Sequence, residues 1–248
     1  MAINKPSVLV ITGAGISADS GIPTFRGRGG YWRNHDPKVL ATRDGFNRDP
    51  ELVWEWYRER RALVHASEPN AAHVAVVQLA HSVPRFLLLT QNVDDLHRRA
   101  RWNGRALDPA SVVQIHGDLF VTRCLNCDFS RPESVADAAG VPRCPKCGSP
   151  LRPGVVWFDE ELSADDEKRV EDFMAKGPCD VVLAVGTTAQ FDYIVNWAVA
   201  AKGDTGQLIE VNPTESALSG HATRIVRQPA AIALPPLVED LVALRPLP

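Results

Sequence analysis

The sequence has no long apolar run and no marked excess of charge of either sign. No apolar segment approaches the ~20 residues that a membrane-spanning helix needs. Lysine and arginine total 27 and aspartate and glutamate total 30, so the net charge of −3 gives no global attraction to nucleic acid or to an anionic membrane. The first apolar stretch runs directly into a glycine-rich turn, as a first β-strand would and a signal peptide would not. These absences favour a cytoplasmic protein.

What the chain does contain is enough apolar material for one large domain, or for one domain with an insertion. Of its 248 residues, 45% are hydrophobic and 23% are charged, which is ordinary for a folded protein with a proper core. There is no internal repeat and no low-complexity tract.

Four of the five cysteines form two close pairs, Cys124 with Cys127 and Cys144 with Cys147. Each pair has the form C-x2-C and the spacer covers 128–143, which is the spacing of a zinc ribbon. In a reducing compartment such pairs indicate a metal more often than disulfides. Four thiolates complete a tetrahedron, so we predict one structural Zn²⁺ that holds together a segment poor in apolar residues. Because a zinc ribbon can also bind nucleic acid, a non-enzymatic nucleic-acid-binding module remains an alternative.

Five apolar runs have the length and β-branched content of buried strands. They cover 7–12, 85–90, 111–117, 180–186 and 207–212. Helical patterns lie between them at 50–66, 70–80, 166–175 and 193–201, and the proline-rich tail contains a last short helix. This alternation indicates an α/β fold in which helices cover both faces of a parallel sheet. Ligands of such sheets bind beyond the carboxyl ends of the strands.

Two segments interrupt the alternation. Residues 27–80 are helical, rich in tryptophan and arginine and without a strand, and residues 118–157 carry the cysteine pairs. We expect a helical insertion and a zinc-ribbon module that together form a smaller lobe over the sheet. The sheet domain would then comprise 1–26, 81–117 and 158–248.

The segment GAGISA, at 13–18, fits the pattern G-x-G-x-x-G/A directly after the first predicted strand. Glycines at these places let the backbone approach a pyrophosphate at the start of a helix. A hydride-transferring dehydrogenase would next have an acidic residue closing a second strand, about 20 residues on. The chain instead reads DSGIPTFRGRGGYW, without a strand and with mostly basic charges, which argues against an ordinary Rossmann oxidoreductase.

Two other strand ends carry polar side chains. TQNVDDLH places Gln91, Asn92 and Asp94 after the second strand, where amide and carboxylate groups can bind a carboxamide. Asn92 or Asp94 can equally cap a helix. His116, at the next strand end, can act as a general base near neutral pH, although a lone histidine is more often structural.

The segment WEWYRERR, at 54–61, combines aromatic and arginine side chains on one predicted helix. Residues three apart share a helix face, so Tyr57 and Arg60 point the same way. Taken alone, the segment favours a surface helix with Trp54 in the core and the arginines in water.

In order and spacing, several segments together resemble the sirtuin (Sir2) family over nearly the whole chain: GAGISADSGIPTFRG, TQNVDDLH, IHGD, the two cysteine pairs, PGVVWFDE, VGTT and IEVN. The resemblance implies a Rossmann-like domain with a zinc-containing lobe, and an NAD-dependent protein lysine deacylase. Its partners would be acylated-lysine proteins or peptides, its products nicotinamide, free lysine and an O-acyl-ADP-ribose, and a monomer is expected. A protein ADP-ribosyltransferase with the same NAD site is the alternative.

The resemblance also implies roles for individual residues. His116 would be the catalytic base. The implied NAD contacts are Gly13, Ala14, Gly15, Ser17, Phe25, Arg26, Gln91, Asn92, Asp94, Gly186, Thr187, Thr188, Asn212 and Ala230. The stretch 155–160 would pair with the substrate backbone as an added strand, with Val156, Trp157 and Phe158 as substrate contacts.

The segment 29–61 further resembles the sirtuin class that removes succinyl and malonyl groups, whose alanine and Tyr-x-x-Arg helix are matched by Ala41, Tyr57 and Arg60. Such acyl groups end in a carboxylate, which is costly to bury without a partner. Arginine and tyrosine can supply charge-assisted hydrogen bonds, so we expect desuccinylase and demalonylase as well as deacetylase activity. The chain departs from the family at Thr188, where serine is usual and a nearby proline is missing, and at Asp159, where glycine is common.

Overall fold

A six-stranded parallel sheet forms the centre of the larger domain in the computed structural model, which describes residues 6–25, 30–31, 36–133 and 140–243. Its strands are β1 (Ser7–Thr12), β2 (Arg85–Thr90), β3 (Val112–Gln114), β7 (Val181–Val185), β8 (Gln207–Val211) and β9 (Arg224–Val226). Their order is β3-β2-β1-β7-β8-β9, so the direction of strand addition reverses between β1 and β7. A reversal of this kind opens a crevice at the carboxyl ends of the strands.

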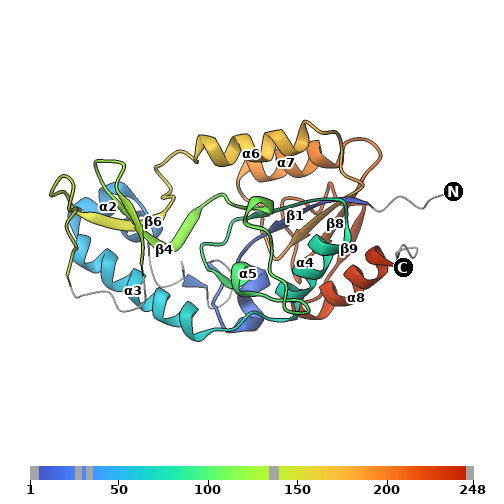
Figure 1. The fold of residues 1–248 in the computed structure, drawn as a ribbon, viewed down its shortest axis with the longest axis horizontal. Helices are drawn as coiled ribbons and strands as arrows, with labels where there is room; N and C mark the ends of the chain where they lie inside the picture. The colour runs from blue at the N-terminus through green and yellow to red at the C-terminus, as the bar shows by residue number, and fades with distance from the viewer. Residues whose placement is uncertain (1–5, 26–29, 32–35, 134–139, 244–248) are drawn as a thin grey trace.

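Helices cover both faces of this sheet, as predicted. Alternate side chains of a strand point to opposite faces, and β1 shows this directly: Val8 and Val10 pack with α4 (Ala71–Ser82) and α8 (Ala230–Val242), and Leu9 and Ile11 pack toward α6 (Ala164–Met174) and α7 (Asp192–Lys202). Figure 1 shows α6 and α7 on one side of the strands and α4 and α8 on the other. The short helices η1 (Ala14–Ser20), α5 (Leu96–Arg99) and η3 (Pro109–Ser111) lie in the connections.

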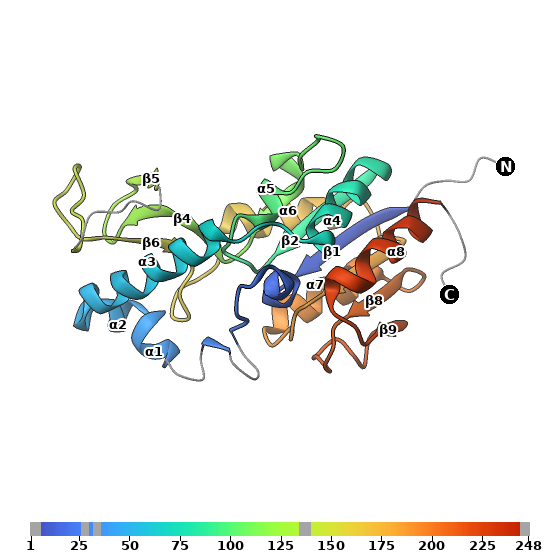
Figure 2. The same cartoon turned by 90° about the horizontal axis from the view of Figure 1, so that it is seen from below.

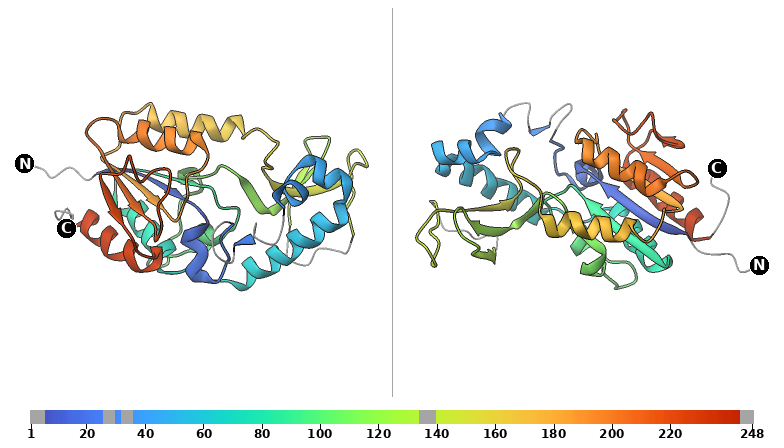
Figure 3. Two further views of the ribbon diagram at one scale, coloured as in Figure 1. Left: turned by 180° about the vertical axis from the view of Figure 1, so that it is seen from behind. Right: turned by 90° about the horizontal axis from the view of Figure 1, so that it is seen from above.

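The smaller lobe combines helices and an antiparallel sheet around one core. Its helices are α1 (Pro37–Leu40), α2 (Arg43–Arg48) and α3 (Pro50–Ala66), and its strands are β4 (Gly117–Cys124), β5 (Ser130–Pro132) and β6 (Leu151–Val155), in the order β5-β4-β6. Phe46 and Trp54 from the helices pack with Leu119, Leu151 and Trp157 from the second segment. Figure 2 shows the three strands along one side of α3, and Figure 3 shows this lobe at the opposite end of the molecule from α8.

Helix α3 begins and ends where the sequence predicts, but its arginines do not lie in water. Asp49 caps it by accepting a hydrogen bond from the backbone N–H of Leu52 at 3.0 Å. Arg60 is 5% exposed and Arg61 is fully buried. Arg61 donates to the Leu119 carbonyl at 2.7 Å, so the surface-helix interpretation of this segment is wrong.

The structure differs from expectation at two helices. Residues 71–80 were expected in the small lobe, yet Ala72, Val76 and Leu79 of α4 pack on the parallel sheet, because their apolar stripe completes that core. We therefore propose that the helical insertion ends before α4. The last helix starts at Ala230 and continues through Pro235 and Pro236. Each proline removes a helix hydrogen bond, and burial of the helix's apolar face against the sheet offsets that loss.

Within the described residues, no helix combines the length and apolar character that crossing a membrane requires.

Candidate active site

A cavity of about 610 Å³ lies at the carboxyl ends of the parallel strands and takes its walls from both parts of the molecule. Most of the residues to which the sequence assigned a role line it: Gly13, Ala14, Gly15, Phe25, Ala41, Tyr57, Arg60, Gln91, Asn92, His116, Val156, Trp157, Phe158, Gly186, Thr187, Thr188, Asn212 and Ala230. Parallel strands end at the same edge of a sheet, which is why residues as distant in sequence as Gly13 and Asn212 meet here. Their individual roles remain predictions.

Ser17 and Asp94 are not in this wall. They line a smaller recess behind it, together with Phe25, Arg60 and Asn92. Ser17 Oγ donates to the Asp94 carboxylate at 2.9 Å and accepts from Asn92 Nδ2 at 3.2 Å. Burial raises the pKa of Asp94, and the network holds the Asn92 side chain at the border of both spaces. Arg26, the remaining predicted NAD contact, lies outside the described residues.

The first glycine-rich turn meets the turn after β7 at the point where the strand order reverses. Gly15 N donates to the Gly186 carbonyl at 2.8 Å. A Cβ on Gly15 would lie 2.7 Å from the Gly186 backbone, and Gly186 itself has φ +60°. This close approach leaves an open surface of backbone, which suits a pyrophosphate. The helix that follows is a 3₁₀-helix, η1, and not the α-helix typical of this pattern.

Thr187 is the centre of a second polar contact set on this side of the cavity. Its hydroxyl accepts from Gln91 Nε2 at 2.8 Å, and its carbonyl accepts from Asn212 Nδ2 at 2.8 Å. These bonds connect the ends of β2, β7 and β8, so three predicted NAD contacts are held in one rigid arrangement.

His116 sits half-buried between β3 and β4 with a defined tautomer. Its Nδ1 lies 3.0 Å from the Gln91 carbonyl. A carbonyl oxygen can only accept, so Nδ1 carries the proton and Nε2 carries the lone pair. Nε2 lies 2.5 Å from the Tyr193 hydroxyl, and the Phe191 ring packs against the imidazole at 5.3 Å between centroids.

Tyr193 and Phe191 both line the cavity, and the sequence reasoning missed them. They belong to the segment VGTTAQFDYIV, in which the family resemblance implies roles only for Gly186, Thr187 and Thr188. Two aromatic residues at the start of the α7 pattern were the available signal.

The small-lobe wall contains a buried arginine among aromatic rings. The guanidinium carbon of Arg60 lies 4.2 Å from the ring centroid of Tyr31, 4.5 Å from that of Trp56 and 4.7 Å from that of Phe25. Its Nε and Nη1 have no hydrogen-bond partner in the part of the chain that the structure describes. Burial lowers the pKa of Arg60, and the neighbouring phenols of Tyr31 and Tyr57 act in the opposite direction.

The stretch 155–160 was expected to pair with the substrate backbone as an added strand. Its only strand residue is Val155, the last residue of β6, and the pairing itself stays a prediction. The loop that follows is held at both sides. Val156 N donates to the His116 carbonyl at 2.8 Å and Phe158 N to the Ala41 carbonyl at 3.0 Å. Asp159, the departure from glycine, accepts from the first N–H of α2, that of Arg43, at 2.9 and 3.0 Å. Its carboxylate thus ties the loop to the small lobe.

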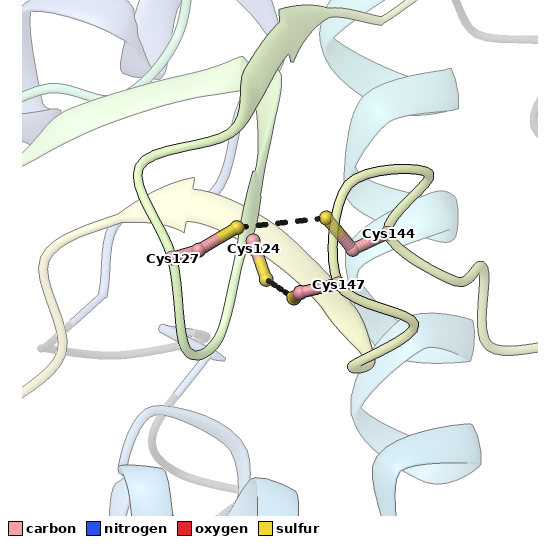
Figure 4. A group of neighbouring side chains, drawn as sticks. All are labelled: Cys124, Cys127, Cys144 and Cys147. Atoms are coloured by element: carbon pink, nitrogen blue, oxygen red, sulfur yellow. Dashed lines mark hydrogen bonds between the residues drawn. The ribbon is translucent and has the colours of Figure 1, made fainter.

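The four paired cysteines come together at the end of β4 and on two neighbouring loops of the small lobe, and their sulfurs point toward one another (Figure 4). All four Sγ atoms lie within 4.8 Å of one another. Cys124 and Cys147 are 3.5 Å apart and Cys127 and Cys144 are 3.6 Å apart. A tetrahedral zinc with Zn–S bonds of about 2.3 Å separates its sulfurs by about 3.8 Å. The donor set and the spacing therefore fit one Zn²⁺, away from the cavity, as a structural ion.

Comparison with known proteins gives one consistent family. The Sir2 family profile matches residues 13–192. A relative from Methylococcus capsulatus, named NAD-dependent protein deacylase, is 42% identical, with 96% of this chain and 94% of the relative covered. A relative of the same name from Pyrococcus furiosus is 40% identical, with 94% and 92% covered. A solved Sir2 homologue–NAD complex is 39% identical with a TM-score of 0.85, covering 96% of this chain and 90% of that one.

Proposed function

This chain belongs to the Sir2 family and is an NAD-dependent protein deacylase, and from this premise we propose that it prefers lysines that carry a succinyl or malonyl group. Acetyl-lysine would be a weaker or comparable substrate. The observation that carries the proposal is the buried Arg60 guanidinium, which lines the cavity with two nitrogens that have no partner among the described residues.

A buried cation without a hydrogen-bonding anion is costly. The rings of Phe25, Tyr31 and Trp56 offset part of that cost through cation–π attraction, but they accept no N–H. Asp94, the anion that acts on the pKa of Arg60, already accepts from Ser17 and from Leu96 N at 3.1 Å. A carboxylate at the end of an acyl group would supply the missing acceptor in planar, charge-assisted geometry.

Tyr57 and Ala41 support the same reading of the pocket. Trp157 Nε1 donates to the Tyr57 oxygen at 3.3 Å, and burial raises the pKa of this phenol. Tyr57 therefore keeps its proton and can donate it to an acyl carboxylate. Ala41 lines the cavity with only a methyl group, where a larger side chain would narrow the space for a four-carbon acyl chain.

The residues on the sheet side fit NAD. We propose that the backbone at Gly13–Gly15 and Gly186 holds its phosphates, that Asn92 and Asp94 bind its carboxamide, and that Thr187, Thr188 and Asn212 bind its adenosine portion. When bound, NAD supplies the sugar carbon to which the acyl oxygen is transferred as nicotinamide leaves. His116 would accept a ribose proton at Nε2, because its Nδ1 is already protonated and donates to Gln91.

Substituting Arg60 tests the acyl preference. Loss of a buried charge partner costs about 2–5 kcal/mol, so Arg60→Met should lower kcat/KM for a succinyl-lysine peptide by about tenfold or more and leave that for the matched acetyl peptide unchanged. Arg48→Met removes an exposed charge from the same lobe and should change neither. Arg60→Lys keeps the charge but loses the planar donor pair, so it should recover only part of the succinyl activity.

Mass spectrometry of the peptides is the readout, since loss of the acyl group lowers the peptide mass and gain of ADP-ribose raises it. The proposed preference is wrong if Arg60→Met lowers both activities equally or neither. A mass gain on the peptide without acyl loss would instead support ADP-ribosyl transfer.

A further inference from the structure

We propose that Tyr193 belongs to the catalytic base, and that its phenol relays the ribose proton to His116. This inference rests on the proposed role of His116 as the base. It begins from one contact, the 2.5 Å between the Tyr193 hydroxyl and Nε2 of His116.

The neutral His116 ring has one basic nitrogen, and the Tyr193 hydroxyl is hydrogen-bonded to it. Because Nδ1 donates to the Gln91 carbonyl, the single lone pair of the neutral ring is on Nε2. A lone pair that already accepts from one hydroxyl cannot accept an equally direct bond from a second. A substrate hydroxyl must therefore either displace the phenol or pass its proton through it.

Packing around Tyr193 disfavours displacement. Its ring stacks on Phe191 at 5.4 Å with 16° between the planes, and it meets Trp197 edge-on at 5.3 Å. Both partners lie on the same short stretch of chain that begins α7, two and four residues away. Moving the phenol off His116 would give up these contacts, whereas a relay leaves the ring in place.

The phenol has the properties that a relay needs. Burial raises the pKa of Tyr193 and the nearby negative charge of Glu167 acts in the same direction, so the hydroxyl keeps its proton and donates it to Nε2. The hydroxyl oxygen retains acceptor capacity, and Tyr193 lines the same cavity as His116 and the proposed NAD contacts.

The proton balance closes without another reactant. Tyr193 takes the proton of the ribose hydroxyl as it gives its own to Nε2, so the phenol is regenerated and His116 carries the positive charge. The electron pair of the broken O–H bond remains on the substrate oxygen for its attack on the acyl carbon. The reverse transfer returns the proton when the products form.

A first experiment examines the contact without NAD. Diethyl pyrocarbonate acylates the free lone pair of a neutral imidazole, and peptide mapping gives the rate at each histidine. In Tyr193→Phe, which keeps the ring contacts and removes only the oxygen, modification of His116 should be severalfold faster than in the wild type. Exposed His65 is the internal reference and should not change. An unchanged His116 rate would mean that the phenol does not occupy Nε2 in solution, and would overturn the proposal.

A second experiment distinguishes a proton relay through Tyr193 from a phenol that only blocks Nε2 of His116 and must move away before the substrate hydroxyl can bind there. Tyr193→Phe should lower single-turnover deacylation by about tenfold or more, as expected for part of an acid–base group, while NAD–nicotinamide exchange is retained because it precedes the base. In mixtures of H₂O and D₂O, a plot of the wild-type rate against the deuterium fraction should be curved, since two protons move together. The same plot for the residual rate of the variant should be a straight line. Trp197→Phe perturbs the same packing without touching the oxygen and should keep the curved dependence.

The outcomes also distinguish this proposal from the one on which it rests. If His116→Ala loses deacylation but Tyr193→Phe deacylates at the wild-type rate or faster, the phenol only blocks Nε2 of His116. In that case the relay alone is wrong. If His116→Ala deacylates normally, the assignment of the base is wrong and the relay is wrong with it.

Discussion

The two parts of the molecule bury very different side chains. The core of the sheet domain is mainly aliphatic on both faces of the strands, as at Leu9 and Val10, and its buried ionisable groups are few, such as His73. The core of the small lobe contains tryptophans and fully buried arginines. Arg152 lies 3.4 Å over the Trp157 ring and pairs with Glu160, and burial, aided by Arg123, lowers its pKa to about 10.

This difference shows how each part contributes to stability and to the site. Apolar burial is non-directional, so we expect the sheet domain to draw its stability mainly from the area of its apolar contacts. Buried cations are costly without well-placed acceptors, so the small lobe depends on specific hydrogen bonds and on its metal. The same division appears in the cavity, where the sheet domain presents backbone and small polar groups and the small lobe presents Arg60 and Tyr57.

Loss of the metal should have the largest effect and should be confined to the small lobe. The binding of a structural zinc contributes folding free energy to a segment with a small core. Cys144→Ala or a strong chelator should therefore unfold the small lobe and abolish deacylation. Hydrogen exchange should become fast in α3, β4 and β6 and remain slow in β1 and β7. Elemental analysis of the folded wild type provides the control, and active protein without zinc would contradict the prediction.

Removing the base should have the next largest effect and should leave both parts folded. Loss of a positioned base costs about two to four orders of magnitude in rate, so His116→Ala should deacylate that much more slowly. NAD binding, measured by calorimetry, should stay near the wild-type value, since the proposed NAD contacts of the sheet domain are intact. Equal losses of binding and rate would indicate a structural role instead.

Arg61 offers a direct measurement of the small lobe's dependence on buried donors. Besides Leu119, it donates to Thr122 Oγ1 at 3.0 Å and to the Val121 carbonyl at 3.2 Å. Arg61→Met leaves these acceptors buried and should lower the free energy of unfolding by on the order of 3 kcal/mol. Urea titration followed by tryptophan fluorescence measures this loss, and exposed Arg48→Met should change it by less than about 0.5 kcal/mol.

A pH effect should be the smallest of the four per pH unit and should arise in the sheet domain. His73 on α4 is fully buried, and burial lowers its pKa to about 3. Between this value and the ordinary value near 6.5 the unfolded chain binds more protons than the folded one, so stability is full above pH 6.5 and falls as the pH drops. The slope from this group is at most ~1.4 kcal/mol per pH unit. His73→Asn should reduce the acid sensitivity of the urea midpoint, and an unchanged slope would exclude His73 as its source.

Local patterns predicted the regular elements well. Strands β1 and β2 and helix α3 have the predicted bounds, because uninterrupted apolar runs and a capped, proline-initiated helix are properties of the nearby chain. The cysteine spacing likewise anticipated the close approach of four sulfurs. The boundary at α4 could not be predicted, because its apolar stripe would suit either core.

The sequence by itself determined the order of strands and helices, the cysteine set and the residues that follow each strand, since backbone periodicity and turn chemistry act over a few residues. Only the tertiary structure decided that Arg60 is buried against three rings, that Asp159 binds the first N–H of α2, and that Tyr193 meets His116. These contacts join residues that are 29, 116 and 77 positions apart. Their formation depends on how two cores pack against each other, which no local pattern encodes.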